Sequence, residues 1–100
     1  MNSISYTNAN FLMIVFYDEK DDDEALMELH ESYDNGLPLR VPCIGEKVWL
    51  SSYEHSYVND RKPLFRHCYE VVDVISNYLE NKEYENITVQ YDIIVREVKQ

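Results

Sequence analysis

The chain has 100 residues, of which 45% are hydrophobic and 13% are aromatic, and it contains only two glycines. Such a chain is too apolar and too poor in flexible residues to stay disordered, so we expect one domain over residues 1–100. Nineteen acidic and nine basic residues give a formal charge of −10, which disfavours direct binding to nucleic acid or to an anionic membrane and favours a basic protein partner.

The sequence also bears on the cellular compartment. The first ten residues carry no basic side chain, and the apolar run from Phe11 to Tyr17 is too short for a signal-peptide core. No window approaches the roughly 20 apolar residues that span a bilayer. We therefore expect a cytoplasmic protein, in which Cys43 and Cys68 are reduced and act as small buried hydrophobic residues.

The N-terminal half predicts one strand and one short helix. Phe11 to Tyr17 is a continuous apolar run rich in aromatic and β-branched residues, which is typical of a strand buried in the middle of a sheet. Acidic residues then precede an apolar stripe with spacings of three and four, and this favours a helix from about Asp22 to Tyr33. A strand through Ala25 to His30 is the alternative.

The C-terminal half predicts three strands. They cover Lys47 to Leu50, Cys68 to Tyr78, and Ile87 to Val98, and the last two form a hairpin closed at Asn81-Lys82. On the last strand, alternate residues from Ile87 to Val95 are apolar and should share one face. The stretch from Ser51 to Arg66 has no clear period and predicts a long loop.

The residues that carry chemistry do not form a recognisable active site. The acidic run lacks the glycine and the alternating spacing of a calcium loop. Cys43, His55, His67 and Cys68 are suitable zinc ligands by type, but no two of them have the spacing of a zinc site. Two isolated glycines cannot build a phosphate-binding loop. We therefore expect neither an enzyme, nor a metal site, nor a cofactor.

Partner binding is the better prediction. Nine of the nineteen acidic residues lie between Asp18 and Asp34, with Lys20 the one basic residue among them. Tyrosine rings are also well suited to protein interfaces, and Tyr78 and Tyr84 lie at strand ends or in loops. The predicted partner-binding residues are Asp18, Glu19, Asp21, Asp22, Asp23, Glu24, Glu28, Glu31, Tyr53 and Tyr57. A basic cluster of Arg61, Lys62, Arg66 and His67 is left open between a binding role and pairing with nearby acids.

Two short motifs resemble a family of small phage and mobile-element proteins. Val41 to Val48 contains Pro-x-x-Gly-Glu-x-Val, Tyr69 to Val74 reads Tyr-x-Val-x-x-Val, and the chain closes with the hydrophobic strand through Ile93 to Val98. The resemblance implies an SH3-like barrel and transfers no catalytic residue. The expected fold class is therefore α+β, mainly β: a small SH3-like barrel or a curved antiparallel sheet of four to five strands, with one short helix.

The resemblance and the charge together suggest a function. Small acidic phage proteins include anti-CRISPR inhibitors, which act as DNA mimics in a nucleic-acid channel; the analogy rests on size and charge. We expect a non-enzymatic inhibitor that binds the basic surface of a nucleic-acid-binding defence protein, such as a nuclease, as a monomer or weak dimer. The alternative is a phage structural, assembly or adaptor module that binds through tyrosines and strand edges.

Overall fold

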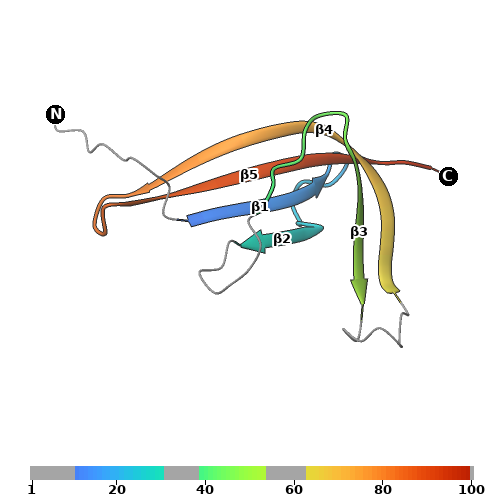
Figure 1. Cartoon of the computed structure of the whole chain (residues 1–100), viewed down its shortest axis with the longest axis horizontal. Helices are drawn as coiled ribbons and strands as arrows, with labels where there is room; N and C mark the ends of the chain where they lie inside the picture. The colour runs from blue at the N-terminus through green and yellow to red at the C-terminus, as the bar shows by residue number, and fades with distance from the viewer. Residues whose placement is uncertain (1–10, 31–38, 54–62, 100) are drawn as a thin grey trace.

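The described part of the chain forms a single sheet of five strands. The computed structural model describes residues 11–30, 39–53 and 63–99, and within these ranges there is no helix, hence none long and apolar enough to cross a membrane. The strands are β1 (Phe11–Asp18), β2 (Met27–His30), β3 (Lys47–Tyr53), β4 (Pro63–Asn81) and β5 (Asn86–Glu97). Their order in the sheet is β2-β1-β5-β4-β3 (Figure 1).

The sheet is mixed and open, so the predicted barrel and the predicted all-antiparallel sheet are both wrong. β5 lies in the middle, parallel to β1 on one side and antiparallel to β4 on the other. Among the described strands, β2 and β3 each have one partner and form the two edges. A closed barrel would need these edges to pair, and in the described part of the chain the edge strand β2 is only four residues long.

β4 bends, and its two halves pair with different neighbours. Its first part, Pro63 to Glu70, pairs with β3, and the part from Tyr69 to Asn81 pairs with β5. Figure 1 shows the strand curving from β3 into a long arm with β5. The register with β5 skips Val72, which is the mark of a β-bulge. The extra residue reverses the alternation of side chains for the rest of β4.

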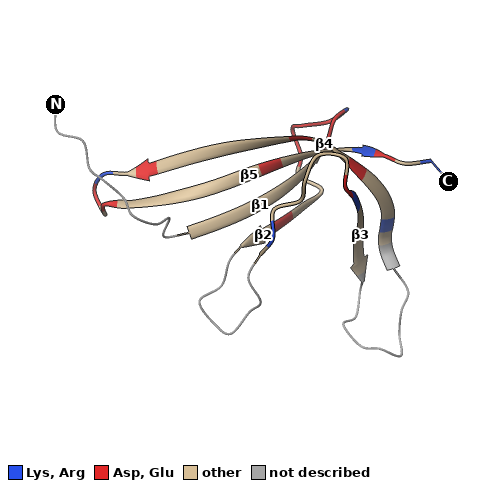
Figure 2. Ribbon diagram, turned by 45° about the horizontal axis from the view of Figure 1, so that its top comes forward, with Lys and Arg blue, Asp and Glu red and all other residues tan. Residues whose placement is uncertain are grey.

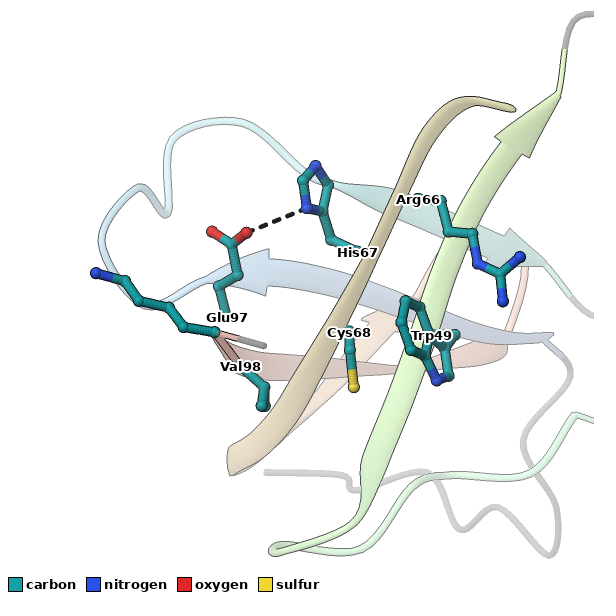
Figure 3. A pocket seen from close by; sticks show the side chains of 7 residues that line it. Trp49, Arg66, His67, Cys68, Glu97 and Val98 are labelled. Atoms are coloured by element: carbon teal, nitrogen blue, oxygen red, sulfur yellow. Dashed lines mark ion pairs between the residues drawn. The ribbon is translucent and has the colours of Figure 1, made fainter. Parts of the chain in front are cut away.

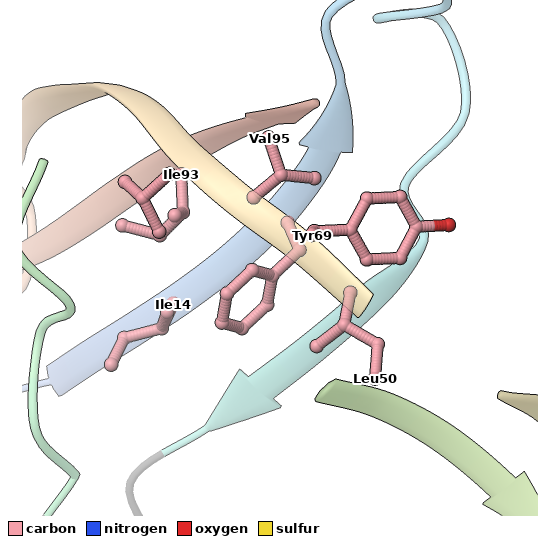
Figure 4. Close-up of a cluster of buried hydrophobic side chains, with 7 residues drawn as sticks. Ile14, Leu50, Tyr69, Ile93 and Val95 are labelled. Carbon is pink, nitrogen blue, oxygen red and sulfur yellow. The ribbon is translucent and has the colours of Figure 1, made fainter. Parts of the chain in front are cut away.

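The hydrophobic core lies on one face of this curved sheet, which we call the inner face. Its seven buried residues come from four strands (Figure 4): Ile14, Phe16, Leu50, Tyr69, Val71, Ile93 and Val95. Alternate residues of β5 point to the inner face, as the sequence predicted: Val89, Ile93 and Val95 are buried, and Tyr91 packs against the cluster. β3 contributes Leu50, which brings the far edge of the sheet into the same core.

The predicted helix from Asp22 to Tyr33 is wrong, and the alternative strand is correct for its second part. Leu26 donates its backbone N–H to the carbonyl of Phe16 at 2.7 Å, and β2 then pairs with β1. Met27 and Leu29 face the core, whereas Glu28 and His30 are exposed. Apolar residues at these positions satisfy a period of two as well as a helical stripe, and pairing with β1 decides between them. Residues 31–33 lie outside the described residues.

The predicted long loop from Ser51 to Arg66 is also wrong at both ends. Ser51 pairs with Arg66 and Ser52 with Phe65, so both flanks belong to strands β3 and β4. Polar residues on a strand edge hide the period of two, which is why the sequence read as a loop. Residues 54–62 lie outside the described residues. The predicted hairpin of the last two strands is formed by β4 and β5. Its last paired residues are Asn81 and Asn86, so the turn is longer than the predicted Asn81-Lys82.

Candidate protein-binding surface

The acidic turn, residues Asp18–Glu24, connects β1 to β2 at one end of the sheet (Figure 2). Its backbone is tied to the sheet by the N–H of Glu19, which donates to the carbonyl of Val95 at 2.8 Å. Carboxylates shape the turn itself: Asp18 Oδ1 accepts the N–H of Lys20 at 3.0 Å, and Asp21 Oδ1 accepts the N–H of Asp23 at 3.2 Å. The turn therefore holds its charges on a defined backbone.

The carboxylates of the turn divide into paired and unpaired groups. Glu19 forms two hydrogen bonds with Arg96, from Nε to Oε1 at 2.8 Å and from Nη2 to Oε2 at 3.3 Å. These bonds are the main reason that the pKa of Glu19 lies below its ordinary value. Asp22, Asp23 and Glu24 are exposed and form no ion pair with any described residue. These three carboxylates are free to meet a basic partner.

Acidic residues outside the acidic turn add to its negative potential. Burial raises the pKa of Tyr17, and the negative charges of Asp92, Glu28 and Asp22 raise it further. Glu28, predicted as a partner-binding residue, is exposed on β2, where its Oε2 lies 3.9 Å from His30 Nε2. Asp92 was missed by the sequence analysis, although its place in the alternation of β5 puts it on the outer face.

The remaining predicted residues are less well placed. Glu31 and Tyr57 lie outside the described residues, as do Arg61 and Lys62 of the basic cluster. Tyr53 ends β3, where only its backbone is described. The structure therefore brings together the described acidic residues from Asp18 to Glu28.

A shallow cleft of about 410 Å³ lies at the far side of the sheet (Figure 3). It contains Arg66, whose guanidinium carbon lies 4.9 Å from the ring centre of Trp49, a cation–π contact. His67 Nδ1 lies 3.1 Å from Glu97 Oε1 at the rim. The sequence did not indicate the pairing of Arg66 with Trp49, because it depends on the register of β3 against β4, in which Trp49 is opposite Cys68.

The cysteines differ from one another. Cys68 is buried, as predicted, but Cys43 is exposed, so its predicted burial is wrong. Cys43 lies in the turn before β3, where its N–H donates to Glu46 Oε1 at 3.2 Å. Both thiols are free, and in the described ranges no three potential metal ligands gather at one point. His55 of the zinc interpretation lies outside those ranges.

A second exposed surface lies on the arm formed by β4 and β5, which Figure 1 shows reaching beyond the start of β1. Four large apolar or aromatic side chains there are exposed: Ile75 (45%), Leu79 (52%), Tyr78 (67%) and Tyr84 (70%). The sequence indicated the two tyrosines by their position at a strand end. Ile75 would face the core if the alternation of Tyr69 and Val71 continued along β4, and the bulge turns it to the other face.

Comparison of the chain with protein-family models, with curated proteins and with solved structures finds no match. The resemblance to small phage proteins therefore stays a prediction.

Proposed function

We propose that this chain is a non-enzymatic binding protein that engages a basic protein surface with its acidic turn. The observation that carries the proposal is the run Asp22, Asp23 and Glu24, three adjacent exposed carboxylates without an ion pair in the described part of the chain. In a chain with a charge of −10, the field of the whole molecule adds to theirs.

The physical basis is competition for cationic side chains. A groove that binds nucleic acid presents arginine and lysine to phosphates, and closely spaced carboxylates satisfy the same donors. Long-range attraction also speeds the encounter, and it weakens as salt screens the charges. A phage-type, anti-CRISPR-like inhibitor that mimics nucleic acid and blocks a defence nuclease would use these interactions.

The turn is suited to this role because its backbone is held by its own side chains. Asp21 binds the N–H of Asp23, and the pair of Glu19 with Arg96 anchors the turn to β5. Carboxylates on an ordered backbone lose less conformational entropy on binding than those on a flexible tail.

The test is affinity capture from a host lysate at low and at high salt, followed by binding measurements on the captured protein. We expect the triple variant Asp22→Asn, Asp23→Asn, Glu24→Gln to keep the fold, to bind at least about tenfold more weakly, and to show a flatter salt dependence. It leaves the carboxylate of Asp21 in place. A matched control neutralises three exposed acidic residues on the arm: Glu80, Glu83 and Glu85.

The two variants separate a local contact from an effect of net charge. If the control weakens binding as much as the turn variant does, the partner responds only to overall charge and the acidic turn is not the contact. If neither variant changes the affinity at about 0.1 M salt, where charges still interact over roughly 10 Å, the proposal is wrong.

A second candidate function is that of an assembly or adaptor module. The observation in its favour is the exposure of Tyr78 and Tyr84 on the arm, since tyrosine is enriched in protein interfaces. In that case Tyr78→Ala and Tyr84→Ala would weaken capture, the three changes in the acidic turn would not, and salt would have little effect.

A further inference from the structure

β4 has a long edge that no described strand covers. β3 pairs with β4 only as far as Glu70, and the turn before β3 extends that cover by two hydrogen bonds, from Gly45 N–H to the carbonyl of Val71 and from Val71 N–H to the carbonyl of Glu46, both 2.8 Å. From Asp73 to Asn81, β4 is paired on its β5 side alone among the described residues. This edge lies along the arm in Figure 1.

The ladder identifies which backbone groups face outward on this edge. The carbonyl of Val95 binds Glu19 on the β1 side, so Val95 and its partner Val71 do not bond to each other. Bonded and non-bonded pairs alternate along an antiparallel ladder. Val74, Ser76, Tyr78 and Glu80 therefore turn their N–H and C=O groups away from β5. In agreement, the N–H of Val74 is bound by the side chain of Asp73, at 2.9 Å.

The side chains beside this edge are apolar and nearly uncharged. Ile75 and Leu79 lie on the outer face of the sheet, 45% and 52% exposed, with Asn77 between them. Of the residues from Asp73 to Asn81, only Asp73 and Glu80 are charged. Natural proteins protect sheet edges with lysine, proline, bulges or short strands, and a long edge with exposed apolar side chains favours pairing with another strand.

We propose that this edge pairs with the same edge of a second copy, antiparallel, about a two-fold axis at Asn77. The pattern of the strand is complementary to itself in this register. Ile75 of each copy lies opposite Leu79 of the other, which gives two apolar cross-strand pairs on the outer face. Ser76 and Tyr78, whose backbone groups face outward, become bonded partners in both directions.

The charges also favour this register over its neighbours. Asp73 lies opposite Asn81 of the other copy, one residue from Lys82, the one basic residue between Asp73 and Glu85. A shift by two residues toward the hairpin turn would set Asp73 against Glu83 and Ile75 against Asn81. A shift by two residues the other way would set Ile75 against Asn77. Both shifts break the apolar pairs, and the first also opposes two carboxylates.

This dimer is independent of the proposed function, because the acidic turn follows the other end of β1. Leu79 pairs with Thr88, which lies beside Phe11 at the start of that strand, whereas Asp18 ends it. Two copies with a charge of −10 each repel one another, so salt should strengthen the dimer. Salt has the opposite effect on binding to a basic partner, which distinguishes the two proposals.

Cysteine crosslinking tests the register in a Cys43→Ser background, in which the remaining Cys68 is buried. Ile75→Cys mixed with Leu79→Cys should give a disulfide-linked dimer under mild oxidation, since opposed residues on paired strands lie within disulfide reach. Neither variant alone should crosslink, because equal residues are offset by four positions, about 13 Å. Tyr84→Cys is the control for a thiol that is exposed but off the edge. Self-crosslinking of Ile75→Cys as efficient as the mixed reaction would overturn the register.

Sedimentation tests the dimer itself. The mass of the unmodified chain should rise from 11.9 kDa toward twice that value with concentration, and more steeply at high salt. Leu79→Glu should hold the chain as a monomer, whereas Tyr84→Glu, which adds the same charge outside the edge, should not. Circular dichroism confirms that both variants fold. A chain that stays at the monomer mass at its highest soluble concentration in high salt, or equal dimerisation by the two variants, contradicts the proposal.

Discussion

The β-bulge at Val72 can be tested by removing the same side-chain atoms at two sites on adjacent strands. Ile93 is fully buried, so Ile93→Ala removes three buried carbons, worth about 2.4 kcal/mol at roughly 0.8 kcal/mol each. The cavity that is left raises the expected loss to about 3–4 kcal/mol. Ile75 is 45% exposed on the other face, so Ile75→Ala loses only part of the transfer energy and leaves no closed cavity. We expect it to cost about 1 kcal/mol.

The assay is urea unfolding followed by circular dichroism and by Trp49 fluorescence, with each variant measured at several low protein concentrations so that dimer formation does not contribute. The two probes should coincide, and the denaturant slope should be unchanged, so that the midpoints report stability. The expected difference between the variants is about 2–3 kcal/mol. If Ile75→Ala destabilises the chain as much as Ile93→Ala does, Ile75 is in the core and the alternation of β4 is not reversed at Val72.

Further predictions concern pH, thiol reactivity and the hairpin turn. The pKa of Glu19 is lower in the folded state than its ordinary value of 4.5, so its contribution to stability is complete above that pH and is lost on acidification. The urea midpoint of unfolding should therefore fall below pH 4.5, and it should fall less steeply in Arg96→Gln. Cys43 should react with a thiol reagent in the native protein and Cys68 only on unfolding, so two equal native rates would contradict the burial described above. Glu85 has φ = 50°, so Glu85→Gly should raise the free energy of unfolding by up to about 1 kcal/mol, and a loss would show that the turn is not strained.

Much of the strand pattern could be predicted because it depends on local alternation. The apolar run from Phe11 to Tyr17 became β1, and the alternate apolar residues from Ile87 to Val95 became the inner face of β5. The sheet topology could not be predicted in this way. The parallel pairing of β1 with β5 joins residues far apart in the chain, and no local pattern distinguishes it from an antiparallel hairpin.

The candidate site, too, could be predicted only in part. The charge of the acidic turn follows from composition, and its position between two strands follows from β1. The sequence does not show which carboxylates stay unpaired. Glu19 is paired with Arg96, which lies 77 residues away in the chain, and the parallel pairing of β1 with β5 brings the two residues together. The exposure of Ile75 depends on a single bulged residue, Val72. Valine is equally common at regular strand positions, so the residue type does not reveal the bulge.

The central place of β5 also determines when the sheet can assemble during synthesis. Of the five described strands, β5 is synthesised last, yet among them it alone joins the β1–β2 pair to the β3–β4 pair. Until Asn86–Glu97 emerges, the nascent chain holds two hairpins with no shared sheet, and β1 and most of β4 present unsatisfied edges. Closing a parallel pair over so long a span is slow, in the range of milliseconds to seconds for sheets of this kind. The newly made chain therefore passes through an interval in which both halves can pair with foreign strands, and fast capture by a chaperone or fast release should raise the yield of native protein.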